Sequence, residues 1–389
     1  MHMAYSFDQK EIEYFLENNL CLSNGSVKNC INFKTGASDF VYNEITGYQL
    51  SILLMKKQRN LLNKKFDEQI ASIVNYLKSQ FRFGNRCIHG MNVDNIIDER
   101  FHVFDNCIIL QSLITYHLIY DDKEVLDLCR RMARWVVSMQ NDNGAFKARE
   151  LNGNVNHSID SFEADESCIN IKSIIPLLRL YQITHESYLL RSIEGSLNWS
   201  EKMMNWDIGL FFANSYKTHH FLHAHCYALE GLQYYMVYHK DDRVARLLHR
   251  GLQGLARLQR LCAGIPHTWN ENRSIKKKLR FLADYGFAVD ASVQAKKLWT
   301  VYNIINNTDE FEKNIKKIDR FILKQYKVYK STKYRGAIGY RKHLFKFFNK
   351  QHSDLNAWPN QFLLGAIDIQ ETFDRGDTEI IEHIKLNWI

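Results

Sequence analysis

The stretch RWVVSMQNDNGAF, residues 134–146, decides the fold, because it closes a helix-length amphipathic segment with a characteristic stop. After Gln140 the chain passes through Gly144 to an apolar anchor, Phe146. Related stops recur with anchors at Phe211, Ile265 and Ile338, after a weaker first copy, SQFRFGNRCIHG, at residues 79–90. The anchors are 65, 54 and 73 residues apart. A unit of that size holds two helices of roughly four or five turns with their loops, so the chain is expected to be a series of helical hairpins.

Bulk composition agrees with a helical globular protein. Three prolines in 389 residues favour long helices, and the hydrophobic content of 46% is ordinary. No run of 18 apolar residues is present, and the first residues lack the apolar core of a secretion signal. The eight cysteines form no CxxC pair, which predicts a cytoplasmic protein with free thiols.

The sequence pattern predicts six helical hairpins. The first helix of each pair is apolar on most sides and is expected at residues 47–59, 105–120, 167–184, 220–238, 289–306 and 358–373. The second helices are amphipathic and are expected at 62–80, 123–140, 187–205, 242–261, 309–327 and 377–387. We therefore predict an all-α (α/α)6 toroid with inner and outer helix layers over residues 46–389, and an irregular extension, 1–45, packed on the ring. Pro176 should kink the third inner helix or delay its start.

Polar residues gather where the inner helices begin. In such a ring the inner helices run the same way, so their N-terminal ends meet at one mouth. Capping explains any single acidic residue at a helix start, but every hairpin offers an ionisable or aromatic side chain there. Carboxyls and imidazoles in one cavity shift each other's pKa values apart, as acid–base chemistry requires.

The candidate site follows from these positions. The predicted catalytic residues are Asp290, Glu166, Asp165 and His223. The predicted substrate-binding residues are Glu44, Tyr48, Asp105, His219, His220, His225, Tyr227, Trp269, Gln294 and Trp358. The histidine tract has no recognised zinc spacing, so neither a metal nor another cofactor is expected.

The motifs NEITGY, HAHCYALEGL and DASVQAKKLW, together with the stops, resemble the six-hairpin toroids of carbohydrate-active enzymes. These include glycosidases, uronyl hydrolases, polysaccharide lyases and the helical domain of glucuronyl C5-epimerases. The chain looks most similar to toroid proteins associated with bacterial surface-polysaccharide synthesis. The stop at 134–146 is also similar to the repeat of terpenoid cyclases, but no DxDD or DDxxD string is present. The paired zinc motifs of lanthionine cyclases are absent as well.

The resemblance implies an enzyme of bacterial polysaccharide metabolism that cleaves or modifies an acidic or amino-sugar glycan by glycoside hydrolase-like carboxylate chemistry. A uronate lyase or C5-epimerase, with Tyr227 or a histidine as base, is the alternative. A non-catalytic partner that binds a glycan or a lipid-linked intermediate is the rival from another class, and terpenoid cyclisation is a further option.

A basic stretch points to an anionic partner. Between Arg320 and Ser353 there are ten Lys or Arg and no Asp or Glu, interleaved with Tyr and Phe. An anionic glycan or lipid-linked phosphate fits this surface better than nucleic acid, although a solvated basic face would look the same.

Overall fold

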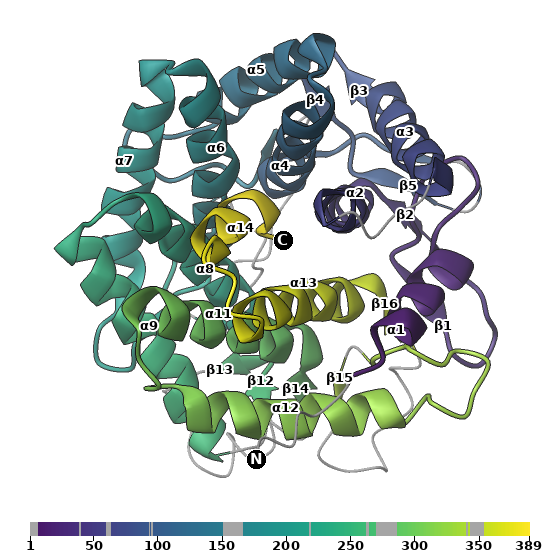
Figure 1. Ribbon diagram of the computed structural model, residues 1–389. Helices are drawn as coiled ribbons and strands as arrows, with labels where there is room; N and C mark the ends of the chain where they lie inside the picture. Colours follow the sequence, from purple (N-terminus) through teal and green to yellow (C-terminus); the bar gives the residue numbers. More distant parts are fainter. Residues whose placement is uncertain are drawn as a thin grey trace.

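Six inner helical segments form a closed ring in the computed structural model (Figure 1). The structure describes residues 7–38, 40–59, 64–92, 94, 96–150, 166–217, 219–261, 264–269, 286–339, 341–342 and 354–389. Each inner segment packs against the next and the last packs against the first, which closes the ring. In order they are α2 (Asn43–Gln58), α4 (Val103–Tyr120), η2 (Cys168–Ser173) with α6 (Ile174–Thr184), α8 (Leu222–Tyr238), α11 (Val289–Asn306) and α13 (Ala357–Asp374). The predicted (α/α)6 toroid is confirmed.

Amphipathic helices form the outer layer. They are α3 (Lys64–Ser79), α5 (Lys123–Ser138), α7 (Ser187–Met203), α9 (Asp242–Leu261) and α12 (Glu312–Lys327). On α5, Val125, Cys129, Met132 and Val136 recur at steps of three and four and are all buried. This spacing places one apolar stripe on the inner layer, and the hydrophobic core lies between the two layers.

The third inner segment starts as a 3₁₀ helix. Residues Cys168–Ser173 form η2, and regular α-helix begins only at Ile174. Pro176 therefore sits in the first turn of α6, where its missing N–H has no helical partner to lose. The delayed start predicted for this helix is confirmed.

The glycines of two stops let these stops pack closely against the next outer helix. Gly144 has a φ of +92°, and a Cβ at this position would lie 2.0 Å from the carbonyl oxygen of Gly195 on α7. Gly209 likewise packs on Arg250 of α9, where a Cβ would lie 2.4 Å from the carbonyl oxygen. Only glycine combines this backbone conformation with so close an approach.

The N-terminal segment supplies the sixth outer helix, which corrects the expectation that residues 1–45 are irregular. Gln9–Phe15 form α1, and Leu16–Leu20 continue it as a π-helix, η1. Gly336, the stop after α12, packs on Glu11 of α1, and Gly25, just after η1, packs on Ser72 of α3. Because α1 and η1 take the same place between stops as the other outer helices, the ring begins well before residue 46.

The last helix, α14 (Ile380–Asn387), is not in the outer layer, where it was expected. Figure 1 shows it at the centre of the ring, and it contacts α2, α8 and α13. The Arg179 guanidinium, from α6, donates hydrogen bonds to the carbonyl oxygens of Lys385 and Leu386, at 2.8 and 2.9 Å. The short helix therefore closes one end of the ring, with its terminal carbonyl groups satisfied by a buried cation.

Short strands line the opposite end. The pairs and small sheets are β1 (Cys30–Asn32) with β16 (Asp354–Asn356); β2 (Phe40–Tyr42), β5 (Gly90–Asn92) and β6 (Ile97–Asp98); β3 (Phe81–Arg82) with β4 (Arg86–Cys87); β7 (Phe101–His102) with β8 (Arg149–Glu150); β9 (Met204–Asn205) with β10 (Leu210–Phe211); β11 (His220–Phe221) with β13 (Thr268–Trp269); and β12 (Ile265–Pro266), β14 (Phe287–Ala288) and β15 (Arg341–Lys342). All of these pairs are antiparallel.

A repeated hydrogen bond joins the start of five inner segments to the segment that follows the outer helix of the same hairpin. The N–H groups of Asn43, Val103, Cys168, Leu222 and Ala357 donate to the carbonyl oxygens of His89, Ala148, Ala213, His267 and Asn29, respectively, at 3.0–3.2 Å. The last of these bonds joins α13 to the segment after η1, as expected if the two ends of the chain share the sixth hairpin. The side chains of the stops are thereby brought to the mouth of the ring.

Candidate functional site

A cavity of about 280 Å³ opens where the inner helices begin. Every inner segment contributes to its wall: α2, α4, η2, α8, α11 and α13 all place first-turn residues there. The lining residues are Tyr42, Glu44, His89, His102, Phe104, Asp105, Ala148, Ile169, Asn170, His223, Tyr227, His267, Asp290 and Trp358. The volume lies near the lower end of the range for small-molecule pockets.

Two carboxyl groups in this cavity have pKa values displaced in opposite directions. Burial raises the pKa of Glu44 well above its ordinary value, and the charge of Asp105 raises it further, against the hydrogen bond from Trp358. For Asp105, burial is outweighed by His89 and His102 and by the Tyr42 hydroxyl, so the pKa is lowered. The two environments therefore displace the pKa values in opposite directions, Glu44 toward the protonated form and Asp105 toward the ionised form, the division that acid–base catalysis uses.

The ionised Asp105 holds an imidazole in place. Its Oδ2 lies 2.7 Å from Nδ1 of His89, and its Oδ1 accepts a hydrogen bond of 3.0 Å from the Tyr42 hydroxyl. With an anion at that distance, Nδ1 of His89 carries the hydrogen, and Nε2 is left as the basic nitrogen of the ring. His102 packs beside His89 with the two rings tilted, 4.8 Å between ring centroids.

A second pair of imidazoles comes from the other side of the ring. His223 lies in the first turn of α8, and His267 lies between β12 and β13, with 5.7 Å between their ring centroids. Figure 1 shows α2 and α8 across the ring from each other. Since His89 is bonded through its carbonyl to the start of α2, imidazoles reach the cavity from two opposing walls.

Aromatic rings provide the apolar part of the wall. The Trp358 indole N–H donates to the Glu44 carboxyl oxygens at 3.1 and 3.3 Å. Phe104 and Tyr227 pack together, with 4.7 Å between ring centroids. Apolar faces beside a few placed polar groups are typical of ligand pockets.

Six of the predicted site residues meet in this cavity: Glu44, Asp105, His223, Tyr227, Asp290 and Trp358. The inference that the starts of the inner helices converge on one acidic, imidazole-rich mouth therefore agrees with the structure. Asp165 lies outside the described residues.

Glu166 does not line the cavity. Its Oε1 accepts hydrogen bonds from the side-chain amides of Asn141 and Asn143, at 2.8 and 2.9 Å. Both asparagines belong to the stop after α5, so Glu166 ties η2 to its neighbouring hairpin. Its place before a helix identified it as a candidate, but the amide-rich turn beside it uses the carboxylate for structure.

Two members of the histidine tract are also structural. His225 is fully buried; its Nδ1 accepts the Phe211 N–H at 3.0 Å, and its Nε2 faces the Gly251 carbonyl oxygen at 3.3 Å. Burial lowers its pKa to about 3, so the ring stays neutral. Nδ1 of His220 lies 2.8 Å from the Phe211 carbonyl oxygen. Both imidazoles therefore bond to backbone groups of the stop that contains Phe211. His225 follows His223 by two residues, so the two side chains cannot share one face of α8.

The remaining candidates lie near the cavity without lining its described wall. Tyr48 is buried one turn below Glu44. Gln294 is buried one turn below Asp290, and its amide has no hydrogen-bond partner among the described residues. The His219 ring lies by Phe221, 6.5 Å between centroids, and Trp269 is in β13.

Three lining histidines were missed by the sequence analysis: His89, His102 and His267. His102 immediately precedes α4 and fits the positional rule that found Asp105. His89 and His267 belong to stops rather than to helix starts, in RCIHG and GIPHTW. Each lies two residues after the apolar anchor position of its stop, as His267 does after Ile265. Ala148, two residues after Phe146, also lines the cavity, so this shared offset is the signal that could have found them.

No metal centre is evident in the described part of the chain, where no group of three or more His, Cys, Asp or Glu is arranged to hold an ion. Within the same residues, no helix is both long and apolar enough to cross a bilayer.

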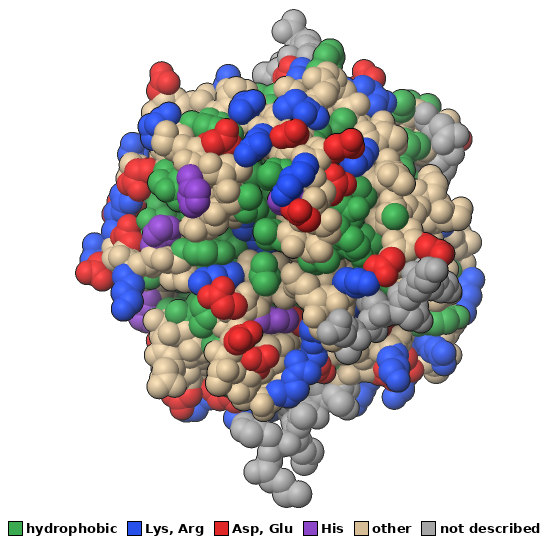
Figure 2. Space-filling view, turned by 45° about the horizontal axis from the view of Figure 1, so that its top comes forward, with side chains coloured by type: hydrophobic (Ala, Val, Ile, Leu, Met, Phe, Trp, Pro, Cys, Tyr) green, Lys and Arg blue, Asp and Glu red, His purple; other side chains and the backbone are tan. Residues whose placement is uncertain are grey.

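The basic stretch is described as far as Gly339, with two further residues of backbone. Lys324, Lys327, Lys330 and Lys333 are exposed. None of the four has a carboxylate within 4.0 Å among the described residues. The face in Figure 2 shows both signs of charge interspersed. An anionic partner at 320–353 stays a prediction.

Comparison with known proteins identifies the fold. No protein-family model matches the chain, and no curated protein matches it in sequence. A cellobiose 2-epimerase from Bacillus thermoamylovorans has a TM-score of 0.73 at 13% identity, covering 93% of this chain and 98% of that one. A D-mannose isomerase has a TM-score of 0.72 at 9% identity, covering 96% and 100%. An α-mannanase from Bacteroides thetaiotaomicron has 0.66 at 10%, covering 94% and 96%.

These similarities confirm the resemblance to toroid carbohydrate-active enzymes at the level of the fold. The same ring carries epimerase, isomerase and hydrolase activities in the three solved structures. The fold alone therefore does not choose among them, and the choice rests on the groups in the cavity.

Proposed function

We propose that the protein transfers a proton at the carbon next to the carbonyl group of a neutral sugar, which epimerises that carbon or converts an aldose into a ketose. The observation that carries the proposal is the pair of imidazole groups on opposing walls of one cavity, His89 on Asp105 and His223 beside His267. Histidine is the side chain best suited to take and return a proton near neutral pH.

The proposed reaction balances without a cofactor. One imidazole removes the proton from the carbon next to the carbonyl; the electron pair of that C–H bond forms a C=C bond, and the π pair of the carbonyl moves to its oxygen. That oxygen takes a proton from Glu44, which gives an enediol. For the epimer, the opposing imidazole returns a proton to the same carbon while the oxygen gives its proton back to Glu44 and the carbonyl re-forms. For the isomer, the former carbonyl carbon takes the proton, and the neighbouring hydroxyl gives up its proton to a carboxylate or imidazole of the cavity and becomes the new carbonyl. The kinds of reaction named for two of the structural relatives support this scheme.

A neutral substrate is proposed because the described lining of the cavity contains neither Lys nor Arg. A uronate carboxylate would bring a negative charge beside Asp105 and Asp290 with no such cation among these residues to pair with it. A lyase or epimerase acting on uronate is therefore less well supported than an enzyme acting on a neutral mono- or disaccharide.

The test is a product assay on neutral aldoses, ketoses and short glycans, with chromatography that separates epimers, isomers and hydrolysis products. His89→Asn and His223→Asn should each lower kcat by about 10²–10⁴-fold, the usual contribution of a general acid or base. His249→Asn is the matched control, because His249 lies on the outer layer and faces Glu310. Conversion that is unchanged in both cavity variants would overturn the proposal.

Hydrolysis is the second candidate, and the opposite pKa displacements of Glu44 and Asp105 favour it. A protonated and an ionised carboxyl group are what a glycosidase requires. Hydrolysis would release new reducing ends, with Glu44→Gln more damaging than either histidine variant. Glycan binding without turnover by the intact protein would instead favour the non-catalytic binding role.

A further inference from the structure

Three charged side chains form a row inside the ring, below the floor of the cavity. Lys172 of η2, Glu230 of α8 and Lys297 of α11 are each no more than 1% exposed. Nζ of Lys172 lies 2.7 Å from one carboxylate oxygen of Glu230, and Nζ of Lys297 lies 2.7 Å from the other. Lys297 also donates to the Ile389 carbonyl oxygen at the closed end of the ring. Lys172 is therefore the member of the row that faces the cavity.

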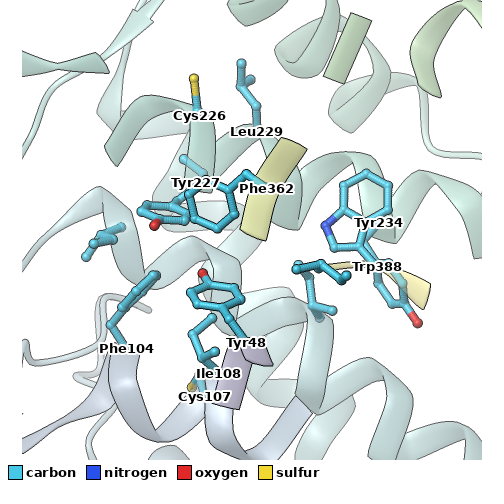
Figure 3. Close-up of a cluster of buried hydrophobic side chains, with 14 of the residues drawn as sticks. Tyr48, Phe104, Cys107, Ile108, Cys226, Tyr227, Leu229, Tyr234, Phe362 and Trp388 are labelled. Atoms are coloured by element: carbon cyan, nitrogen blue, oxygen red, sulfur yellow. The ribbon is translucent and has the colours of Figure 1, made fainter. Parts of the chain in front are cut away.

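Aromatic residues connect Lys172 to the cavity. Its Nζ donates a hydrogen bond of 2.9 Å to the Tyr48 hydroxyl and lies 4.6 Å from the centroid of the Tyr227 ring. Tyr48 and Tyr227 thus both contact the ammonium group, and Tyr227 lines the cavity. Figure 3 shows the two tyrosines and Phe362 gathered in one buried cluster. The contact between the ammonium group and the Tyr227 ring thus links Lys172 to the cavity wall.

If the Lys172–Glu230–Lys297 row served packing alone, its burial would cost the fold free energy. Moving an ammonium group out of water carries a penalty of several kcal/mol, and an apolar side chain of similar volume often serves the fold as well. Burial lowers the pKa of Lys172 to about 8, against the opposing effect of Glu230, so the group remains charged at neutral pH. The charge also acts inside the cavity, because it favours the ionised form of Glu44. Lys172 therefore stabilises negative charge near Glu44.

We propose that Lys172 is a positioning residue which, through Tyr48 and Tyr227, stabilises the negative charge that forms on the sugar oxygen during proton transfer. This inference rests on the proposed function, because it requires a substrate that is neutral when bound and negatively charged in the transition state. Preorganised donors aimed at such a charge are among the largest contributions to enzymatic rate.

The test compares Lys172→Met with Lys297→Met in the full chain. Each substitution removes one cation and leaves Glu230 paired with the other, so the change in charge and in burial is matched. Lys172→Met should lower kcat by about 10²–10³-fold, the effect of removing one such donor, while KM for the neutral sugar stays within about threefold. Lys297→Met should keep kcat within about tenfold. Equal losses in both variants would mean that the row serves only the fold.

A binding measurement tests the inference without turnover. The probes are a sugar hydroxamate, whose anion resembles the negatively charged transition state, and the corresponding neutral alditol, both titrated by calorimetry. Lys172→Met should weaken hydroxamate binding by about 100-fold and alditol binding by less than threefold, with Lys297→Met close to the intact protein for both. If hydroxamate binding is unchanged in Lys172→Met, the inference is overturned.

Failure of the role of Lys172 can be distinguished from failure of the proposed function. Turnover by the intact protein together with equal effects of the two methionine variants rejects the role of Lys172 and leaves the proposed function standing. Absence of epimer and ketose with every sugar rejects the proposed function whatever the variants do. Should Lys172→Met fail to fold, the double variant Lys172→Met, Glu230→Gln removes the pair together and is measured with the same two probes.

Discussion

Glu44 and Asp105 share one cavity, and burial acts on both, yet only Asp105 has imidazole and hydroxyl partners close enough to reverse its effect on the pKa. The folded-state pKa of Glu44 lies above its value of 4.5 in the unfolded chain. Between these two values the folded protein keeps a proton that the unfolded chain has released. The contribution of Glu44 to stability is therefore complete below pH 4.5 and is lost as pH rises through the folded-state pKa.

Glu44→Gln should remove this dependence. Because glutamine resembles a protonated carboxyl group, we expect the change in Tm relative to the intact protein to become more positive from pH 5 to pH 8, as measured by thermal unfolding. The same substitution at Glu382, on the exposed side of α14, controls for the loss of a carboxylate. A Tm difference that is the same at both pH values would contradict the raised pKa of Glu44.

At the scale of single residues the sequence predicts position better than role. Glu44, Asp105, His223 and Asp290 were found because they precede or begin inner helices, and that position alone brings them to the mouth. Glu166 has the same position, but two asparagine amides of the adjacent stop bind its carboxylate. Such a long-range partner leaves no mark in the spacing of one sequence, so the outcome required coordinates.

At the scale of elements, the stops determine how neighbouring hairpins fit together. Gly144→Ala should lower the free energy of unfolding by about 1–2 kcal/mol for the left-handed backbone and by about 1–3 kcal/mol more for overpacking, because the added Cβ would lie 2.0 Å from the Gly195 oxygen. Gly84→Ala is the control: its φ is +69°, but nothing lies within 4 Å of the added carbon. Urea unfolding of both variants measures the difference. Equal losses would contradict the close approach at Gly144.

The elements themselves follow the hydrophobic pattern closely, with two instructive differences. The segment Gln9–Leu20 was expected to be irregular, because it has no partner helix beside it in sequence. Its partner is α13, more than 300 residues later, and Gly25 completes its stop. The helix expected at 377–387 forms, but α1 already fills the sixth outer place, so α14 packs on the ring axis. Neither result is visible in local periodicity.

At the scale of the whole molecule, closure of the ring makes the site. The two ends of the chain take part in the closure: the N-terminal segment fills the outer layer, and α14 closes one end, where Arg179 binds its final carbonyl groups. At the opposite end, the described residues form the cavity over the helix starts that carry the polar residues.

The most direct measurement is solvent exchange at the reacting carbon. The protein is incubated in D2O with a neutral aldose that the product assay identifies, and the signal of the hydrogen next to the carbonyl group is followed by proton NMR. We expect this signal to disappear with the intact protein and with His249→Asn, and to persist with the double variant His89→Asn, His223→Asn. Turnover of the sugar with that hydrogen fully retained would contradict proton transfer through the opposing imidazole groups.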